Sequence, residues 1–149
     1  MIYTDSCKYA IRAMIHIATH REDPALVTAG EIAEAEEIPP YYLAKILQDL
    51  ARARLLKSVR GRGGGFSLSR QPLEIPVIEI VEAVEDTRRL KDECILGLEE
   101  CNDDVPCPLH RTWSKFRDSC LDSLQTLTLA DLELELQKKQ LANRRAEKG

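Results

Sequence analysis

The sequence lacks the features that would place the chain in a membrane or direct it across one. It contains no run of about 18 consecutive apolar residues, the length that a membrane-spanning helix needs. Its start, MIYTDSCKYA, has no basic segment followed by a long apolar one, as a secretory signal would have. We therefore expect a cytoplasmic protein with no membrane partner.

Signatures of enzymes are also missing. We find no nucleophile motif, no paired carboxylates and no zinc-hydrolase signature. The glycine-rich segment GRGGG lacks the G-x-x-x-x-G-K-[ST] pattern and the following helix of a nucleotide-phosphate loop. The sequence therefore predicts a protein that is not an enzyme, and a small metal-dependent enzyme is the weakest alternative.

Cysteine is present in an unusual arrangement. The chain has 149 residues, of which 44% are hydrophobic, and this is enough for one domain whose core needs no disulfides. Structural disulfides are not expected for its five cysteines in a reducing cytosol. Three of the five share one short segment with a histidine; these four residues are Cys94, Cys101, Cys107 and His110. Such a cluster indicates metal or redox chemistry.

The charge of the chain is unevenly distributed. The net charge is -4, yet residues 41–70 carry seven basic side chains and one acidic side chain. A basic segment in an otherwise acidic chain is the electrostatic signature of a phosphate-binding surface. Nucleic acid is therefore an expected partner in spite of the overall charge.

The first third of the chain has the pattern of a helix-turn-helix. Helical spacing of apolar residues predicts helices over residues 6–20 and 28–35, and the prolines at 39–40 suit the first turn of a third helix that ends near residue 53. One face of this third helix is apolar. The opposite face carries Tyr41, Lys45, Gln48 and Arg52. Phenol, amide and cationic groups of this kind contact phosphates and base edges, although a solvated helix face is the plain alternative.

The next segment predicts a β-hairpin. Two strand-like pieces, residues 55–60 and 66–70, flank GRGGG. A helix-turn-helix followed by a basic hairpin is a winged helix, whose wing arginines can enter a minor groove. The expected DNA-contacting residues are Tyr41, Tyr42, Lys45, Gln48, Arg52, Arg60, Arg62 and Gly64.

The remaining chain predicts more helices around the cysteine segment. We expect a fourth helix over residues 76–87, a loop over 91–107, a long apolar helix over 108–127, a capped segment from Thr128, and a charged, flexible tail. The expected division is a winged helix-turn-helix domain (1–72), a cysteine-loop and long-helix part (73–136) and a tail (137–149). The long helix is apolar enough to need a partner, either its own domain or a second copy of the chain.

The spacing of the three cysteines leaves the metal open. Zinc sites usually have short C-x₂₋₄-C knuckles, whereas the wider gaps here favour a loop around an iron–sulfur cluster. A zinc site of three cysteines and His110 remains an alternative. His110 is either a ligand or a hydrogen-bond donor.

Other candidate groups have simpler interpretations. Cys120 repeats with the apolar residues of the long helix and is expected in the core. Cys7 is expected to be an ordinary small residue of the first helix. His16 and His20 are four residues apart on that helix, but the sequence offers them no neighbouring cysteine or carboxylate, and we do not expect a metal there.

These features together resemble a known family. The segments MIYTDSCKYAIRAM, YYLAKILQDLARARLLKSVRGRGGGFSLSR and IPVIEIVEAVEDT, with the three cysteines and His110, are similar to Rrf-type winged-helix transcription regulators, typified by IscR, NsrR and CymR. The similarity extends over residues 1 to about 136. It implies a mainly α fold with a small β-hairpin wing, in which the winged helix-turn-helix is followed by a long C-terminal dimerisation helix.

The resemblance also implies partners and ligands. It implies a homodimer on a roughly palindromic double-stranded DNA operator, and a cluster ligated by Cys94, Cys101 and Cys107. The fourth ligand stays open between His110 and an acidic residue from the first helix of the partner copy, where Asp5 lies; Cys7, in the first turn of the same helix, is a further candidate. The cluster type, 2Fe-2S or 4Fe-4S, is also open, because the first gap is one residue longer than in IscR.

The resulting expectation is a DNA-binding repressor that senses iron–sulfur cluster status, redox state or nitric oxide. The alternative is a winged-helix regulator that binds zinc or works as a thiol switch without a cluster. The two expectations differ in whether the protein is coloured.

Overall fold

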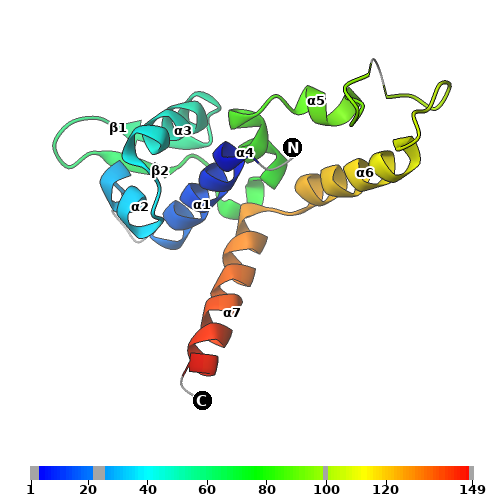
Figure 1. Cartoon of the computed structure of the whole chain (residues 1–149). Coiled ribbons are helices and arrows are strands. Elements are labelled where there is room, and N and C mark those ends of the chain that lie inside the picture. Colours follow the sequence, from blue (N-terminus) through cyan, green and yellow to red (C-terminus); the bar gives the residue numbers. More distant parts are fainter. Residues whose placement is uncertain (1–3, 22–25, 99–100, 148–149) are drawn as a thin grey trace.

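The computed structural model describes residues 4–21, 26–98 and 101–147. The helices are α1 (Asp5–Thr19), α2 (Ala29–Ala35), α3 (Pro40–Arg52), the short 3₁₀ helix η1 (Pro72–Glu74), α4 (Val77–Val84), α5 (Thr87–Asp92), α6 (His110–Thr126) and α7 (Leu129–Glu147). The strands are β1 (Leu56–Val59) and β2 (Gly65–Leu68). Figure 1 shows a body formed by α1 to α4 and the hairpin, from which α6 and α7 project in different directions. The expected mainly α, winged-helix fold is confirmed.

Helix α1 is the centre of the body. It contacts α3, α4, α7 and β2. Its buried positions include the small residues Ala10 and Ala13, which let neighbouring helices approach closely, and the larger Met14 and Ile17. The side chain of Thr4 accepts a hydrogen bond from the backbone N–H of Cys7 and caps the helix. Helices α2, α3, α4 and α7 and strand β2 are therefore placed directly against this helix.

Helices α2 and α3 form the helix-turn-helix that the sequence predicts. Thr28 and Glu31 make a capping box at the start of α2. The turn after α2 places Glu37 at a positive φ of 51°, and Pro39 and Pro40 then begin α3. The buried face of α3 consists of Leu43, Ile46, Leu47 and Leu50.

The hairpin is the predicted wing. Its two strands pair antiparallel, from Leu56 opposite Leu68 to Val59 opposite Gly65. A further bridge between Val27 and Phe66 ties the wing to the segment before α2. The turn requires a residue without a side chain at Gly64, where a Cβ atom would lie 2.1 Å from the Val59 carbonyl oxygen.

Backbone hydrogen bonds hold the junction between α6 and α7 against the body. Backbone N–H groups of Val77 and Leu129 donate to the carbonyl oxygens of Leu127 and Ile75, at 2.9 and 2.8 Å. Leu129 is fully buried in the main core, and Leu124 packs in a second core cluster with Cys7, Val77 and Val81. The two long helices are thus held at their shared corner and extend outward from it (Figure 1).

Several boundaries differ from the sequence-based expectations. Helix α4 ends at Val84, and the short α5 follows in a segment where no helix is expected. Helix α6 begins at His110 instead of at residue 108, and α7 continues through residues 137–147, where a flexible tail is expected. Cys120 is half-buried instead of in the core, because in one chain α6 meets the body mainly around Leu124. None of the described helices is both long and apolar enough to cross a membrane.

Candidate DNA-binding surface and cysteine loop

The outward face of α3 is open to solvent. Tyr41 is 91% exposed, and Lys45 and Gln48 are exposed and make no hydrogen bond or ion pair within the described part of the chain. Arg52 is exposed as well and contacts Asp49 at 2.9 Å. Three of these four groups are thus free to meet a ligand, and the fourth is already oriented by a neighbouring carboxylate.

Tyr42 differs from the other expected DNA-contacting residues. Its hydroxyl lies 3.0 Å from the Ser6 hydroxyl, and its ring meets the ring of Tyr9 edge-on, with centroids 5.6 Å apart. Although 41% of Tyr42 is exposed, these contacts connect α3 to α1. The structure therefore gives Tyr42 a role in positioning α3.

The wing presents two unpaired arginines. Arg60 and Arg62 are exposed, and neither has a hydrogen-bond or ion-pair partner among the described residues. Gly64 lies between them and β2, where it permits the turn. Figure 1 shows that the wing and α3 lie at one end of the body, whereas the cysteine segment lies beyond α5 at the other.

Side-chain contacts that were not expected from the sequence hold the turn between α2 and α3. Arg12 of α1 contacts a carboxylate oxygen of Glu36 at 3.1 Å and also donates to the Glu36 carbonyl oxygen. The other carboxylate oxygen of Glu36 lies 3.2 Å from Nδ1 of His16, whose ring stacks on His20. The two histidines therefore support the turn before α3. No sequence signal links them to Glu36, because the contact joins separate helices.

Backbone contacts shape the cysteine segment. At its start, the N–H of Gly97 donates to the Cys94 carbonyl oxygen, and the indole N–H of Trp113 donates to the Glu93 carbonyl oxygen. At its end, the N–H of His110 donates to the Cys107 carbonyl oxygen at 2.9 Å. These contacts hold both ends of the loop beside the first turns of α6.

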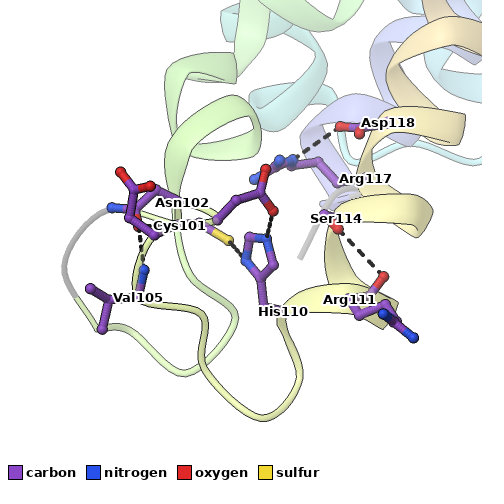
Figure 2. Close-up of polar contacts among 10 residues, drawn as sticks. Cys101, Asn102, Val105, His110, Arg111, Ser114, Arg117 and Asp118 are labelled. Carbon is purple, nitrogen blue, oxygen red and sulfur yellow. Dashed lines mark hydrogen bonds and ion pairs between the residues drawn. The ribbon is translucent and has the colours of Figure 1, made fainter.

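The structure brings the four expected metal ligands together as two pairs. The Sγ atoms of Cys94 and Cys107 are 3.6 Å apart, and Sγ of Cys101 lies 3.1 Å from Nδ1 of His110. Figure 2 shows Cys101 and His110 pointing toward each other, with the imidazole anchored on its other side. That anchor is Asp103, whose Oδ1 lies 2.9 Å from Nε2 of His110.

The pairs do not form a closed metal site in this conformation. Among the described residues, no three histidine, cysteine or acidic side chains are close enough together to hold a metal ion. The donor chemistry nevertheless suits a soft metal, because thiolates and an imidazole are the ligands of zinc and of iron–sulfur clusters. A cluster would need the two pairs to approach each other.

Two of the cysteines have shifted pKa values. The pKa of Cys94 is lowered chiefly by the backbone N–H of Leu96, with smaller contributions from Cys107 and Leu98, which favours the thiolate that metals bind. Burial raises the pKa of the thiol of Cys7, which packs from α1 against residues of α4 and α6. Asp5 contacts Lys8 at 3.0 Å. Within the part of one chain that the structure describes, neither Cys7 nor Asp5 therefore joins the cysteine pairs.

Known proteins agree with this architecture. The Rrf2 family profile, described as "Iron-dependent Transcriptional regulator", matches residues 3–134. The transcriptional regulator IscR of Pectobacterium atrosepticum is 31% identical over 132 residues, which cover 89% of this chain and 79% of that protein. The solved structure of CymR, the global cysteine regulator of B. subtilis, matches with a TM-score of 0.71 at 25% identity, covering 89% of this chain and 96% of the other. T. potens IscR matches with a TM-score of 0.71 at 27% identity, covering 93% and 90%.

The resemblance expected from the sequence is thereby confirmed. The family match spans the winged helix, the cysteine loop, all of α6 and the start of α7. The relatives and fold neighbours reported above are regulators, not enzymes. The chain therefore belongs to the Rrf2 family of transcriptional regulators.

Proposed function

We propose that the chain is a cytoplasmic repressor that binds a double-stranded DNA operator as a homodimer and senses an iron–sulfur cluster. The cluster is held by Cys94, Cys101 and Cys107. The observation that carries this proposal is the meeting of the three cysteines and His110 as two close pairs at the entrance to α6. The description of the family as iron-dependent supports it.

The donor set leaves one ligand open. Cluster irons are held by cysteine thiolates, and histidine replaces cysteine in some centres. His110 supplies an imidazole beside Cys101, and an acidic residue from the first helix of a second copy is the alternative. When bound, the cluster supplies a group that responds to iron supply, oxygen or nitric oxide.

The DNA-binding residues divide by position. Lys45, Gln48 and Tyr41 on α3 face the major groove, while Arg60 and Arg62 reach phosphates or the minor groove beside it. Arg52 binds a phosphate next to them. Tyr42 and Gly64 act indirectly, by orienting α3 and shaping the wing.

A second copy covers α6. Phe116 is 54% exposed in one chain, which is unfavourable for an aromatic ring of this size. A partner subunit on this face would bury the ring.

The cysteine loop is connected to the DNA-binding body through α6. The loop leads directly into α6, whose far end is hydrogen-bonded to the winged-helix body through Leu127 and Val77. Drawing the two cysteine pairs together would therefore reposition α6 relative to its partner. Half-sites about one helical turn apart tolerate little change in the spacing of the two winged helices.

The test is an anaerobic purification followed by measurement of the visible spectrum and of iron, sulfide and zinc per chain. A coloured protein with iron and acid-labile sulfide is expected, with different operator affinities before and after cluster removal. Cys94→Ala should lose the colour and keep a folded dimer, whereas Cys120→Ala, outside the loop, should keep both. A colourless protein with stoichiometric zinc would support the zinc-bound alternative and overturn cluster sensing.

A further inference from the structure

Two of the three loop cysteines already contact each other, and the third is engaged elsewhere. Sγ of Cys94 and Sγ of Cys107 are 3.6 Å apart. Cys101 instead contacts His110, and Asp103 holds that imidazole from its other side. The three cysteines are therefore not equivalent, although the sequence spacing does not distinguish them.

We propose that, when no cluster is bound, peroxide converts Cys94 and Cys107 into a reversible disulfide within one chain, and that Cys101 stays reduced. Transient, redox-sensing disulfides are the kind that does occur in a reducing compartment. The effect of this disulfide on cluster loading rests on the function proposed above. Its formation depends only on the contact between the two thiols.

The surroundings of the pair assign different roles to its members. Cys107 lines a hollow of about 360 Å³ together with Pro106, Pro108, Arg111 and Lys115. Cys94 is 7% exposed and does not line this hollow. A small oxidant therefore reaches Cys107 first, and Cys94 is the resolving cysteine.

The chemistry needs one peroxide for each disulfide. The sulfur of Cys107 attacks one oxygen of hydrogen peroxide, the O–O bond breaks, and the leaving hydroxide departs as water with the thiol proton, which leaves a sulfenic acid on Cys107. The sulfur of Cys94 then attacks the Cys107 sulfur, the S–O bond breaks, and a second water leaves with the Cys94 proton. Two thiols are oxidised, and the peroxide is reduced to two waters.

The loop can accommodate the new bond with a local movement. A disulfide requires the two sulfurs to approach from 3.6 Å to about 2.05 Å. The middle of the loop is closed by its own turn, in which Asn102 accepts hydrogen bonds from the backbone N–H groups of Asp104 and Val105. This turn does not involve the two cysteines, so it does not oppose their approach.

The consequence concerns cluster loading. A Cys94–Cys107 disulfide removes two of the three thiolates that would hold a cluster. The regulator would then have a third state, oxidised and unable to accept iron until a thiol reductant restores both cysteines. Cluster loss under peroxide would last longer than cluster loss through lack of iron.

The pairing is tested by mapping the disulfide in reduced, metal-free protein treated with one equivalent of hydrogen peroxide. All three loop cysteines lie on the tryptic peptide 92–111, so further cleavage at Glu99 or Glu100 and at Asp103 or Asp104 is needed to separate them. We expect the Cys94–Cys107 linkage as the main product, within a chain that migrates as a monomer without reductant. Pairs that include Cys101, or linkage between chains, would overturn the proposal.

Matched variants separate the roles of the cysteines. Cys101→Ser should form the same disulfide at about the same rate as the unaltered protein. Cys94→Ser should stop at a sulfenic acid on Cys107, which dimedone captures and mass spectrometry locates. Dimedone label mainly on Cys101, or loss of the disulfide in Cys101→Ser, would contradict the assigned roles.

Cluster reconstitution distinguishes this inference from the proposed function. The oxidised protein should acquire no cluster absorbance until dithiothreitol is added, whereas the reduced protein should load directly. If the reduced protein never takes up iron while the Cys94–Cys107 linkage still forms, the proposed function fails and the disulfide stands. If the protein takes up iron but forms mixed disulfides, the disulfide assignment fails and the proposed function stands.

Discussion

The sulfur of Cys101 lies 3.1 Å from Nδ1 of His110. The opposite nitrogen of the same ring lies 2.9 Å from Asp103, and an N–H on that nitrogen would donate to the carboxylate. Nδ1 then keeps its lone pair and faces the thiol. Carboxylates that orient a histidine in this way often hold it ready as a metal ligand.

The first prediction concerns this carboxylate. Asp103→Asn should weaken cluster retention by about tenfold, because outer partners of a ligating histidine typically contribute 10- to 100-fold to metal affinity. Iron release to a chelator, followed by absorbance, measures the effect. Asp104→Asn removes a neighbouring carboxylate that makes no side-chain contact among the described residues and should release iron at the original rate. Equal rates in both variants would mean that Asp103 does not act through His110.

The wing arginines should contribute to affinity through phosphates. Arg60→Ala and Arg62→Ala should each weaken operator binding and reduce the slope of log affinity against log salt by about one unit per lost phosphate contact. Fluorescence anisotropy at several salt concentrations measures both quantities. Arg144→Ala changes the charge equally on the exposed α7 and should leave the slope unchanged. An unchanged slope in both wing variants would remove the wing from the interface.

Gly64 should be needed for the shape of the wing. Gly64→Ala would place its Cβ 2.1 Å from the Val59 carbonyl oxygen, so the turn must move and DNA affinity should fall. Gly30→Ala is the matched control, because its Cβ meets only the Thr28 hydroxyl at 3.9 Å. The control should bind DNA normally and gain about 0.5 kcal/mol of stability. Normal binding by Gly64→Ala would show that the wing turn adapts.

Self-association should depend on α6. Phe116→Asp places a charge on the face proposed to meet a second copy and should yield a folded monomer. Leu73→Asp alters a residue that is 71% exposed on η1 and should remain dimeric. Sedimentation analysis reports the mass, and circular dichroism reports the fold. A dimeric Phe116→Asp would place the dimer interface elsewhere.

The hydrogen bonds that cap α7 should stabilise the folded protein, and this stabilisation should be lost in acid. Thr128 donates from its backbone N–H and its hydroxyl to Asp131, both at 2.8 Å, and these bonds lower the pKa of Asp131 below its usual value of 3.8. The stabilisation is therefore present above about pH 4 and is lost as the pH falls through the lowered pKa. Thr128→Val removes the hydroxyl bond, so the Asp131 pKa, followed by NMR titration, should rise toward 3.8. No change in this pKa would show that the backbone bond alone accounts for the shift.

Much of the winged helix could be predicted from sequence because its signals are local. The apolar spacing of Leu43, Ile46 and Leu50 indicates a buried helix face, and the glycine-rich turn indicates a hairpin. Helix α5 was missed because its sequence, TRRLKD, has too few apolar residues for a periodic pattern and is short. The exposure of Phe116 was not predictable either, since it depends on how α6 leaves the body.

The cysteine loop shows the limit of such reasoning. Its residue types indicate metal or redox chemistry, but its spacing does not say that Cys94 meets Cys107 and Cys101 meets His110. That pairing depends on the path of the loop and on contacts such as Trp113 with the Glu93 carbonyl oxygen. The supporting role of Asp103 likewise appears only when the loop is folded.

The attachment of α6 to the body at one end also limits which insertions and deletions this helix can tolerate. His110 and Leu124 are the buried residues of this helix, and their separation of 14 positions places them within about 40° on one face, because each residue turns the helix by about 100°. Inserting one residue between them would carry the whole cysteine loop about 100° around the helix axis. Insertions and deletions in this stretch should therefore be tolerated mainly in multiples of seven residues, because only these keep His110 and Leu124 on the same face of α6. The length of α6 should then be as restricted as the identity of the residues that bind the cluster.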